Sequence, residues 1–350
     1  VVSHSERIEM EVEGEYGLKT NMAFSHEDDF EEKHPETHKT IKTAIKIANP
    51  EKFPLSVLTK EFIALEKKKL TTATCRRKEK HIQDFIDYFN DPEIKEITKR
   101  KCSDYAYSIL KNKDPANETL RNNILDIGTL FSWAENRGYT EYNPFYRLKL
   151  PVGRKNAQDR KPWSDEDIIK FFTSDFINKN EFIATAISLY TGMRLDEICR
   201  LKHKDIFDDL FHIYEGKTKA ASRVVPVHPV LKKIIVSNYS DEKDYILKGL
   251  VSGGYDKKRS GNFSKRHGRT RKKLNFPNGV VFHTLRNTVI TKLQNNLIPL
   301  YNIEQIIGHK QKSVAFGVYS GGLAVKHLRE IINGISYGNT IDNLMLNYKI

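Results

Sequence analysis

The sequence has few cysteines and no long apolar run, and each absence excludes a class of protein. Its 350 residues include three cysteines, Cys75, Cys102 and Cys199, which are widely separated and form no CxxC pair. This spacing argues against a disulfide framework and against a cysteine zinc site. There is no run of about 18 apolar residues, and the first ten residues lack the basic and apolar regions of a signal peptide. We expect a folded cytoplasmic protein with no membrane partner.

Acidic residues are outnumbered by basic ones outside the N-terminus. The formal net charge is +13, and residues 1–36 hold eleven acidic residues against three basic ones, which leaves a net charge of +21 on the rest of the chain. Lysine and arginine in such excess are typical of proteins that bind a polyanion, because neutralising phosphates releases condensed counterions. A polyanion is therefore the expected class of partner, but charge alone does not identify it.

The length exceeds what one hydrophobic core usually supports, so we expect more than one domain. Residues 1–54 are predicted to form an acidic arm or partial domain, and upstream sequence could be missing because the chain begins with Val1. Residues 55–147 show apolar spacing typical of four amphipathic helices, most clearly over 117–137. Residues 148–162 are predicted to be a basic linker, and 163–350 a second domain with a C-terminal tail.

Basic residues gather in the helical region and again over 257–273, which we expect to be a glycine-interrupted loop. Any one cluster is most simply a solvated surface, but several together favour contact with a DNA backbone. The candidate DNA-contact residues are Arg76, Arg77, Lys78, Lys257, Lys258, Arg259, Lys265, Arg266, Arg269 and Arg271.

Two local patterns predict how the second domain begins and where its sheet lies. Ser164, followed by Asp165 and Glu166, is typical of a helix N-cap with acidic residues in the first turn. Residues 210–215 and 222–229 alternate in a way that predicts an antiparallel hairpin.

Four short motifs in this domain carry residues suited to phosphate chemistry. They are TGMRLDEI (191–198), GKT (216–218), HTLR (283–286) and IGHK (307–310), the last followed by Tyr319 ten positions after His309. Each alone has an ordinary explanation, such as a surface ion pair between Arg194 and Glu197 or a structural histidine. Their ordered combination is what favours a catalytic site.

In this order the motifs resemble those of the tyrosine recombinases, or phage integrases. The family's order of Arg, Lys, His-x-x-Arg, His and Tyr is matched by Arg194, Lys217, His283, Arg286, His309 and Tyr319, and its acidic residue by Glu197. The similarity covers about residues 163–325 strongly and 55–147 more loosely. It implies a mainly α fold with a small antiparallel β-sheet, in which a helical core-binding bundle precedes a mixed α+β catalytic domain. Lys219 remains an alternative to Lys217.

The resemblance and the chemistry together assign roles to these residues. Arg194 and Arg286 would bind the non-bridging oxygens of the attacked phosphate, where charge develops. The phenol of Tyr319 needs a base, for which His283 is the candidate, and Lys217 would protonate the leaving 5′ oxygen. His309 would bond the phosphate, and Glu197 would orient neighbouring side chains.

A site-specific recombinase or integrase of a prokaryote, phage or other mobile element is the function implied, acting near the nucleoid through a 3′-phosphotyrosine. No cofactor or metal is expected, because the sequence has neither a GxxxxGK[ST] loop nor a carboxylate cluster suited to two Mg²⁺ ions. The implied partners are double-stranded DNA, further copies forming a homotetramer on two DNA sites, and accessory DNA-bending proteins. The alternatives are a type IB topoisomerase and a non-catalytic DNA-binding protein of the same fold.

The tail beyond Tyr319 is predicted to form a helix over about 323–332, a break over 334–339 and a final apolar turn from Ile341. An apolar terminal segment must be buried somewhere. It either folds back on its own domain or, as in the family it resembles, docks on a neighbouring protomer.

Overall fold

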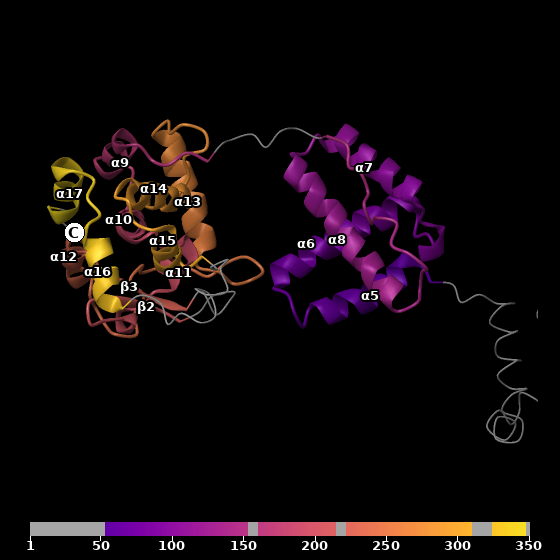
Figure 1. The fold of residues 1–350 in the computed structure, drawn as a ribbon, viewed down its shortest axis with the longest axis horizontal. Helices are drawn as coiled ribbons and strands as arrows, with labels where there is room; N and C mark the ends of the chain where they lie inside the picture. The colour runs from indigo at the N-terminus through magenta and orange to yellow at the C-terminus, as the bar shows by residue number, and fades with distance from the viewer. Residues whose placement is uncertain (1–52, 153–159, 215–221, 310–323, 348–350) are drawn as a thin grey trace, which may run out of the picture. The chain divides into compact units, whose positions relative to one another are not determined.

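The computed structural model describes residues 53–152, 160–214, 222–309 and 324–347, and it divides into two compact units, Val1–Lys155 and Asn156–Ile350 (Figure 1). The expected acidic arm, 1–54, lies outside the described residues except for its last two positions. None of the described helices combines the length and the apolar character needed to cross a membrane.

The N-terminal unit consists of helices, as the apolar spacing of 55–147 predicted. They are α5 (Leu55–Glu66), α6 (Thr72–Phe89), α7 (Lys99–Lys113) and α8 (Asn117–Asn136), with a 3-10 turn η1 (Ile94–Glu96). The N-caps of α6 and α7 are Thr71 and Thr98, whose side chains each accept a hydrogen bond from the backbone N–H three residues later. Helices α5, α6 and α8 pack against one another. The ring of Phe85 in α6 lies at the centre of this core, 6.1 Å from that of Phe131.

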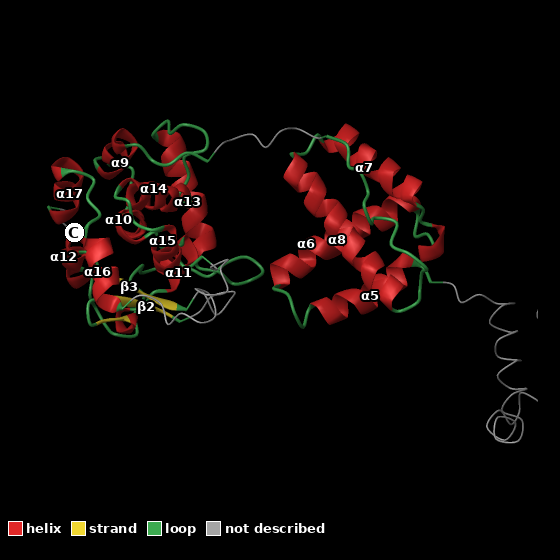
Figure 2. Cartoon of the chain, in the orientation of Figure 1, coloured by secondary structure: helices red, strands yellow, loops and turns green. Residues whose placement is uncertain are grey.

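The C-terminal unit combines helices with a three-stranded sheet, which lies at the lower edge of the unit in Figure 2. Its helices are α9 (Asp165–Phe172), α10 (Lys179–Thr191), α11 (Leu195–Arg200), the 3-10 turn η2 (His203–Asp205), α12 (Pro229–Ser237), α13 (Ser260–Lys273), α14 (Thr284–Asn295), α15 (Leu300–Ile307), α16 (Val325–Asn333) and α17 (Asn339–Leu346). Its strands are β1 (Ile206–Phe207), β2 (Leu210–Ile213) and β3 (Arg223–Pro226), in the order β1-β2-β3 and all antiparallel. The predicted hairpin is present, with Phe211 opposite Val225. The fold class, mainly α with a small antiparallel sheet, is confirmed.

Helix α10 is the centre of the second core. All its residues from Glu181 to Thr191 are buried, and α14, α11 and α12 pack around it. Helix α9 begins at Ser164 as predicted, with a reciprocal pair of bonds between Ser164 and Asp167. Because α10 is enclosed, the residues at its C-terminal end are held at a fixed position.

The expectation of a loop over 257–273 is wrong from residue 260 onward. Residues 260–273 form the helix α13, which buries Phe263, His267 and Thr270 at spacings of four and three residues. Burial of this stripe stabilises the helix despite Gly261 and Gly268, at which an added Cβ would meet open space. The basic residues occupy the remaining surface of α13.

The C-terminal tail packs against its own unit. Helix α17 lies on α12 and α9, and its residues Ile341 and Met345 are buried (Figure 1). The hydroxyl of Tyr190, near the end of α10, donates a 2.5 Å hydrogen bond to Asp342 of α17. Of the two arrangements considered for the tail, the structure therefore shows the one in which the tail folds back on its own domain.

Candidate active site

The turn between α10 and α11 places Arg194. Helix α10 ends at Gly192, which has a left-handed φ of 66° and whose added Cβ would lie 3.1 Å from a side-chain carbon of Ile307. The carbonyl of Gly192 accepts a 2.8 Å hydrogen bond from Nη1 of Arg286. A glycine is required here both for the backbone conformation and for the close approach of α15. Two residues later, Arg194 is the N-cap of α11.

Glu197, in the first turn of α11, joins Arg194 to the sheet. One of its oxygens accepts from the backbone N–H of Arg194 and the other from Nη1 of Arg194, both at 2.8 Å. Both oxygens also accept from Arg223 of β3, at 3.1 Å. Burial alone would raise the pKa of Glu197, but the bonds and charges of Arg223 and then Arg194 outweigh it and hold the pKa below its ordinary value. Glu197 is therefore a carboxylate at neutral pH.

Arg286 lies beneath the surface in α14, only 3% exposed. Burial, together with the positive charges of Arg194 and Arg223, lowers the pKa of its guanidinium to about 9, and Glu197 partly opposes this. Its Nη2 has no hydrogen-bond partner among the described residues. Since buried donors are nearly always bonded, this atom is suited to an anionic oxygen that comes from outside the chain.

A second left-handed glycine shapes the turn before His309. Helix α15 ends at Gly308, with φ of 67°, and the Gly308 carbonyl accepts a 3.0 Å bond from Nη2 of Arg194. An added Cβ at Gly308 would lie 2.7 Å from Nη1 of Arg223. The turn can therefore approach the arginines only with a glycine at this position.

His283 and His309 lie at the exposed side of this cluster. Partial burial and the charges of Arg160, Arg286 and Arg194 lower the pKa of His283. Burial and the charges of Arg286 and Arg194, among others, do the same to His309. Both rings therefore favour the neutral form at neutral pH, in which one ring nitrogen can accept a proton.

The structure thus brings together five residues singled out by sequence: Arg194, Glu197, His283, Arg286 and His309. Lys217, its alternative Lys219, and Tyr319 lie outside the described residues. Among the described residues no group of three or more His, Cys, Asp or Glu side chains is placed to hold a metal ion.

Arg223 was missed by the sequence reasoning. Its partners, Glu197 and the backbone carbonyl of Ile306, lie 26 and 83 positions away in the chain. The available signal was an arginine at the head of an otherwise apolar strand, RVVP, where the neighbours are suited to burial.

Several of the predicted DNA-contact residues are bonded within the chain. Lys78 is buried and its Nζ lies 2.6 Å from Glu66, and Arg259 donates to three backbone carbonyls, those of Cys199, Leu247 and Leu250. For Lys78 and Arg259 these contacts favour a structural role over the predicted one.

The other candidate DNA-contact residues differ in their bonds within the chain and in their exposure. Arg77 pairs with Asp126, Arg266 pairs with Glu181, and Arg271 donates to the carbonyl of Val280. The exposed candidates, for which DNA contact stays a prediction, are Arg76, Arg77, Lys257, Lys258, Lys265, Arg266 and Arg269.

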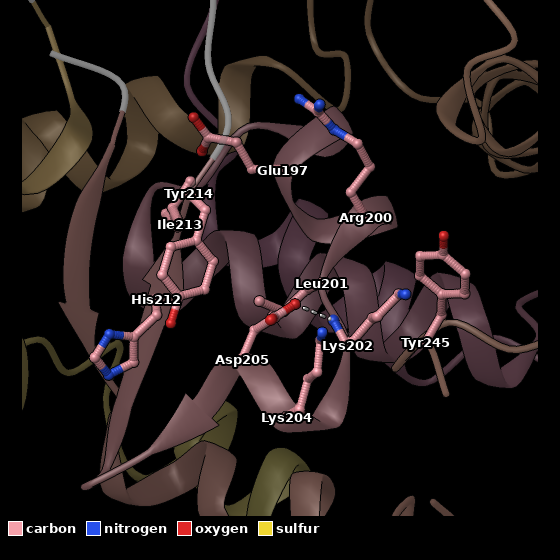
Figure 3. Close-up of a pocket in the computed structure, with 10 residues that line it drawn as sticks. All are labelled: Glu197, Arg200, Leu201, Lys202, Lys204, Asp205, His212, Ile213, Tyr214 and Tyr245. Atoms are coloured by element: carbon pink, nitrogen blue, oxygen red, sulfur yellow. Dashed lines mark hydrogen bonds between the residues drawn. The ribbon is translucent and has the colours of Figure 1, made fainter. Parts of the chain in front are cut away.

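A pocket of about 280 Å³ opens beside Glu197, between the segment that follows α11 and strand β2 (Figure 3). Arg200, Lys202 and Lys204 line it together with Asp205, which accepts a 2.9 Å bond from the backbone N–H of Lys202. The positive charge of the arginine cluster therefore continues along this side of the unit.

Comparison with known proteins finds a family model that matches much of the C-terminal unit. The model of the phage integrase family matches residues 166–321. A tyrosine recombinase of Thermosipho africanus is 25% identical over 253 residues, which are 69% of this chain and 86% of the relative. An integrase of Enterobacteria phage P21 is 25% identical over 159 residues, 44% of this chain and 40% of the relative.

Two solved structures share the fold. The Tn1549 transposon integrase, in complex with a circular intermediate DNA, matches with a TM-score of 0.62 and 19% identity over 79% of this chain and 98% of its own. A lambda integrase tetramer bound to a Holliday junction matches with a TM-score of 0.63 and 15% identity over 81% of this chain and 84% of its own. Together with the matched motifs and the arginine cluster, these likenesses identify residues 166–321 as a phage integrase domain, the kind found in tyrosine-type site-specific DNA recombinases.

Proposed function

We propose that this recombinase cuts one DNA strand at a time by joining Tyr319 to the 3′ side of the break, and that it needs neither a metal nor ATP. The observation that carries the proposal is the buried Nη2 of Arg286, which lacks a partner among the described residues and lies within the positive field of Arg194 and Arg223. Such a field stabilises an anion whose charge grows in the transition state.

In the proposed reaction the Tyr319 oxygen attacks the phosphorus, a bond to that oxygen forms, and the bond from phosphorus to the 5′ oxygen breaks. Arg194 and Arg286 bind the non-bridging oxygens and hold them as their charge rises. The neutral ring of His283 accepts the phenolic proton, and His309 donates a hydrogen bond to the phosphate. Lys217 gives a proton to the departing 5′ oxygen, which leaves as a hydroxyl.

Rejoining follows the same path in reverse. The phosphotyrosine ester keeps the energy of the broken phosphodiester, so a second 5′-hydroxyl can displace Tyr319 with no nucleotide hydrolysis. The guanidinium groups supply the positive charge for which other phosphoryl-transfer enzymes use metal ions. This is the physical basis for expecting a reaction without a metal or ATP.

Double-stranded DNA and further copies of the chain are the proposed partners. The two solved relatives are bound to a circular intermediate DNA and, as a tetramer, to a Holliday junction. We extend both properties to this chain, which carries a net charge of +13 and exposed basic residues on α13. A homotetramer on two DNA sites would allow paired strands to be exchanged, and accessory DNA-bending proteins would be additional partners.

A nicked suicide substrate, in which the cleaved fragment diffuses away, tests the proposal. Native protein should form a covalent adduct in the presence of a chelator, Tyr319→Phe should form none, and Tyr239→Phe serves as the control. An adduct formed by Tyr319→Phe would contradict the assignment. Relaxation of supercoiled plasmid without exchange between two sites would instead favour the topoisomerase alternative.

A further inference from the structure

All three guanidinium nitrogens of Arg223 donate hydrogen bonds within the protein. Nη1 and Nη2 each donate to a different oxygen of Glu197 at 3.1 Å, and Nε donates to the carbonyl of Ile306 at 2.8 Å. The side chain is 7% exposed. A paired contact of this kind fixes the plane of the carboxylate as well as its position.

The same guanidinium packs against the turn that carries His309. The Cβ of any residue other than glycine at position 308 would lie 2.7 Å from Nη1 and 2.9 Å from Cζ of Arg223. Arg223 therefore touches the last turn of α15 both by a hydrogen bond, at Ile306, and by close packing, at Gly308.

These contacts close a ring around Arg194. Its Nη1 donates to the same Glu197 oxygen that Nη1 of Arg223 reaches, and its Nη2 donates to the carbonyl of Gly308. Among the described residues, Glu197 and Gly308 orient Arg194, and Arg223 bonds to the first and packs against the second.

We propose that Arg223 is a positioning residue. It fixes Arg194, which binds the phosphate in the proposed reaction, and the turn at Gly308 that precedes His309, without itself touching the phosphate. The inference rests on the proposed function. It adds a positioning role for a residue of β3 that is not among the six motif residues. Because Arg223 begins β3, the sheet, α11 and the end of α15 are set relative to one another by one side chain.

The test uses two variants. Arg223→Gln can still form hydrogen bonds but has no charge, and Arg223→Lys keeps the charge but lacks the paired N–H donors of the guanidinium. The control is Arg329→Gln, since Arg329 bonds to Asp208 in the turn at the other end of the sheet. We expect adduct formation at saturating protein to fall about 100-fold in Arg223→Gln and about 10-fold in Arg223→Lys, because a displacement of about 1 Å at reacting groups can cost this much. DNA affinity should change less than about threefold, since phosphate contacts elsewhere dominate it.

A second substrate separates positioning from general loss of structure. Replacing one non-bridging oxygen of the scissile phosphate with a methyl group removes the charge that Arg194 stabilises. The Arg223→Gln defect should then shrink about fivefold or more, in parallel with that of Arg194→Ala, because Arg194 has less charge left to stabilise. Equal defects on both substrates, or a native rate in both Arg223 variants, would overturn the inference. Absence of an adduct with the native protein would overturn the proposed function and, with it, this inference.

Discussion

Replacing Glu197 with glutamine should destabilise the C-terminal unit while increasing its affinity for anions. The carboxylate is 5% exposed at its side chain and is shared by Arg194 and Arg223. Removing one partner from a buried ion pair costs about 3–5 kcal/mol. Because Arg194 is 35% exposed and one amide oxygen still accepts hydrogen bonds, we take the lower end, about 3 kcal/mol. For a unit of this size that is a fall in Tm of about 6–12 °C.

The stability lost in Glu197→Gln should depend on pH and should be smaller under acidic conditions. The pKa of Glu197 in the folded protein lies below its ordinary value of 4.5, so the stability that its charge contributes is complete above 4.5 and is lost as pH falls through the folded value. The difference in Tm between native protein and Glu197→Gln should therefore be constant from pH 8 to pH 5. It should shrink only at more acidic pH.

Glu181→Gln is the matched control. Glu181 is fully buried and accepts bonds from Arg266 at 2.8 Å and Thr270 at 2.7 Å, at the opposite end of α10 from Arg194. Both variants should lower Tm in thermal unfolding. Added sulfate should restore more of the loss in Glu197→Gln, because only there do several guanidinium groups remain close together without their carboxylate. Equal restoration in the two variants, or a fall in Tm below 2 °C for Glu197→Gln, would refute the reasoning.

Further predictions concern Arg286 of the proposed phosphate site, Gly308, His283 and the C-terminal tail. Arg286→Lys should lower adduct formation by about 100-fold or more while DNA affinity measured in binding titrations changes only a few fold; complete loss of binding would show a structural role instead. Gly308→Ala should also lower adduct formation with little change in DNA affinity, and it should lower Tm, because the added Cβ would collide with Arg223. Since the pKa of His283 is below its ordinary 6.5, the cleavage rate should stay level from pH 8 to 6.5 and fall at lower pH, and a fall beginning above 7 would contradict the assigned base. Tyr190→Phe should cost about 1–3 kcal/mol of unfolding free energy by removing the bond to Asp342, as chemical denaturation would measure.

Local patterns predicted most of the fold. The helix of 117–137 and the hairpin of 210–229 follow from apolar spacing and strand alternation, and both are present as α8 and as β2 with β3. The prediction was wrong over 260–273, where the charge and the glycines favoured a loop although Phe263, His267 and Thr270 recur at helical spacing. Burial of one narrow stripe against the unit outweighed the poor helix propensity of the other positions.

The site was predictable where its residues sit in short motifs and was not where partners come from distant parts of the chain. Arg194 and Glu197 are three residues apart, so their pairing follows from helix geometry. Arg223 reaches Glu197 only because the sheet packs beside α11 and α15, and no local pattern contains that information. The tail is a similar case, since its apolar spacing predicted burial but not the surface that would bury it.

Helices α10 and α15 end in the same way, on a left-handed glycine whose carbonyl is bonded by an arginine from another segment. The terminal carbonyls of a helix must find donors, and here Arg286 and Arg194 provide them. An alanine scan of these arginines would therefore measure two losses at once, that of a phosphate ligand and that of a helix terminus. Lysine or glutamine replacements, compared with alanine at the same position, would tell the two apart. For protein engineering, altering the chemistry of either arginine also means rebuilding the end of a helix.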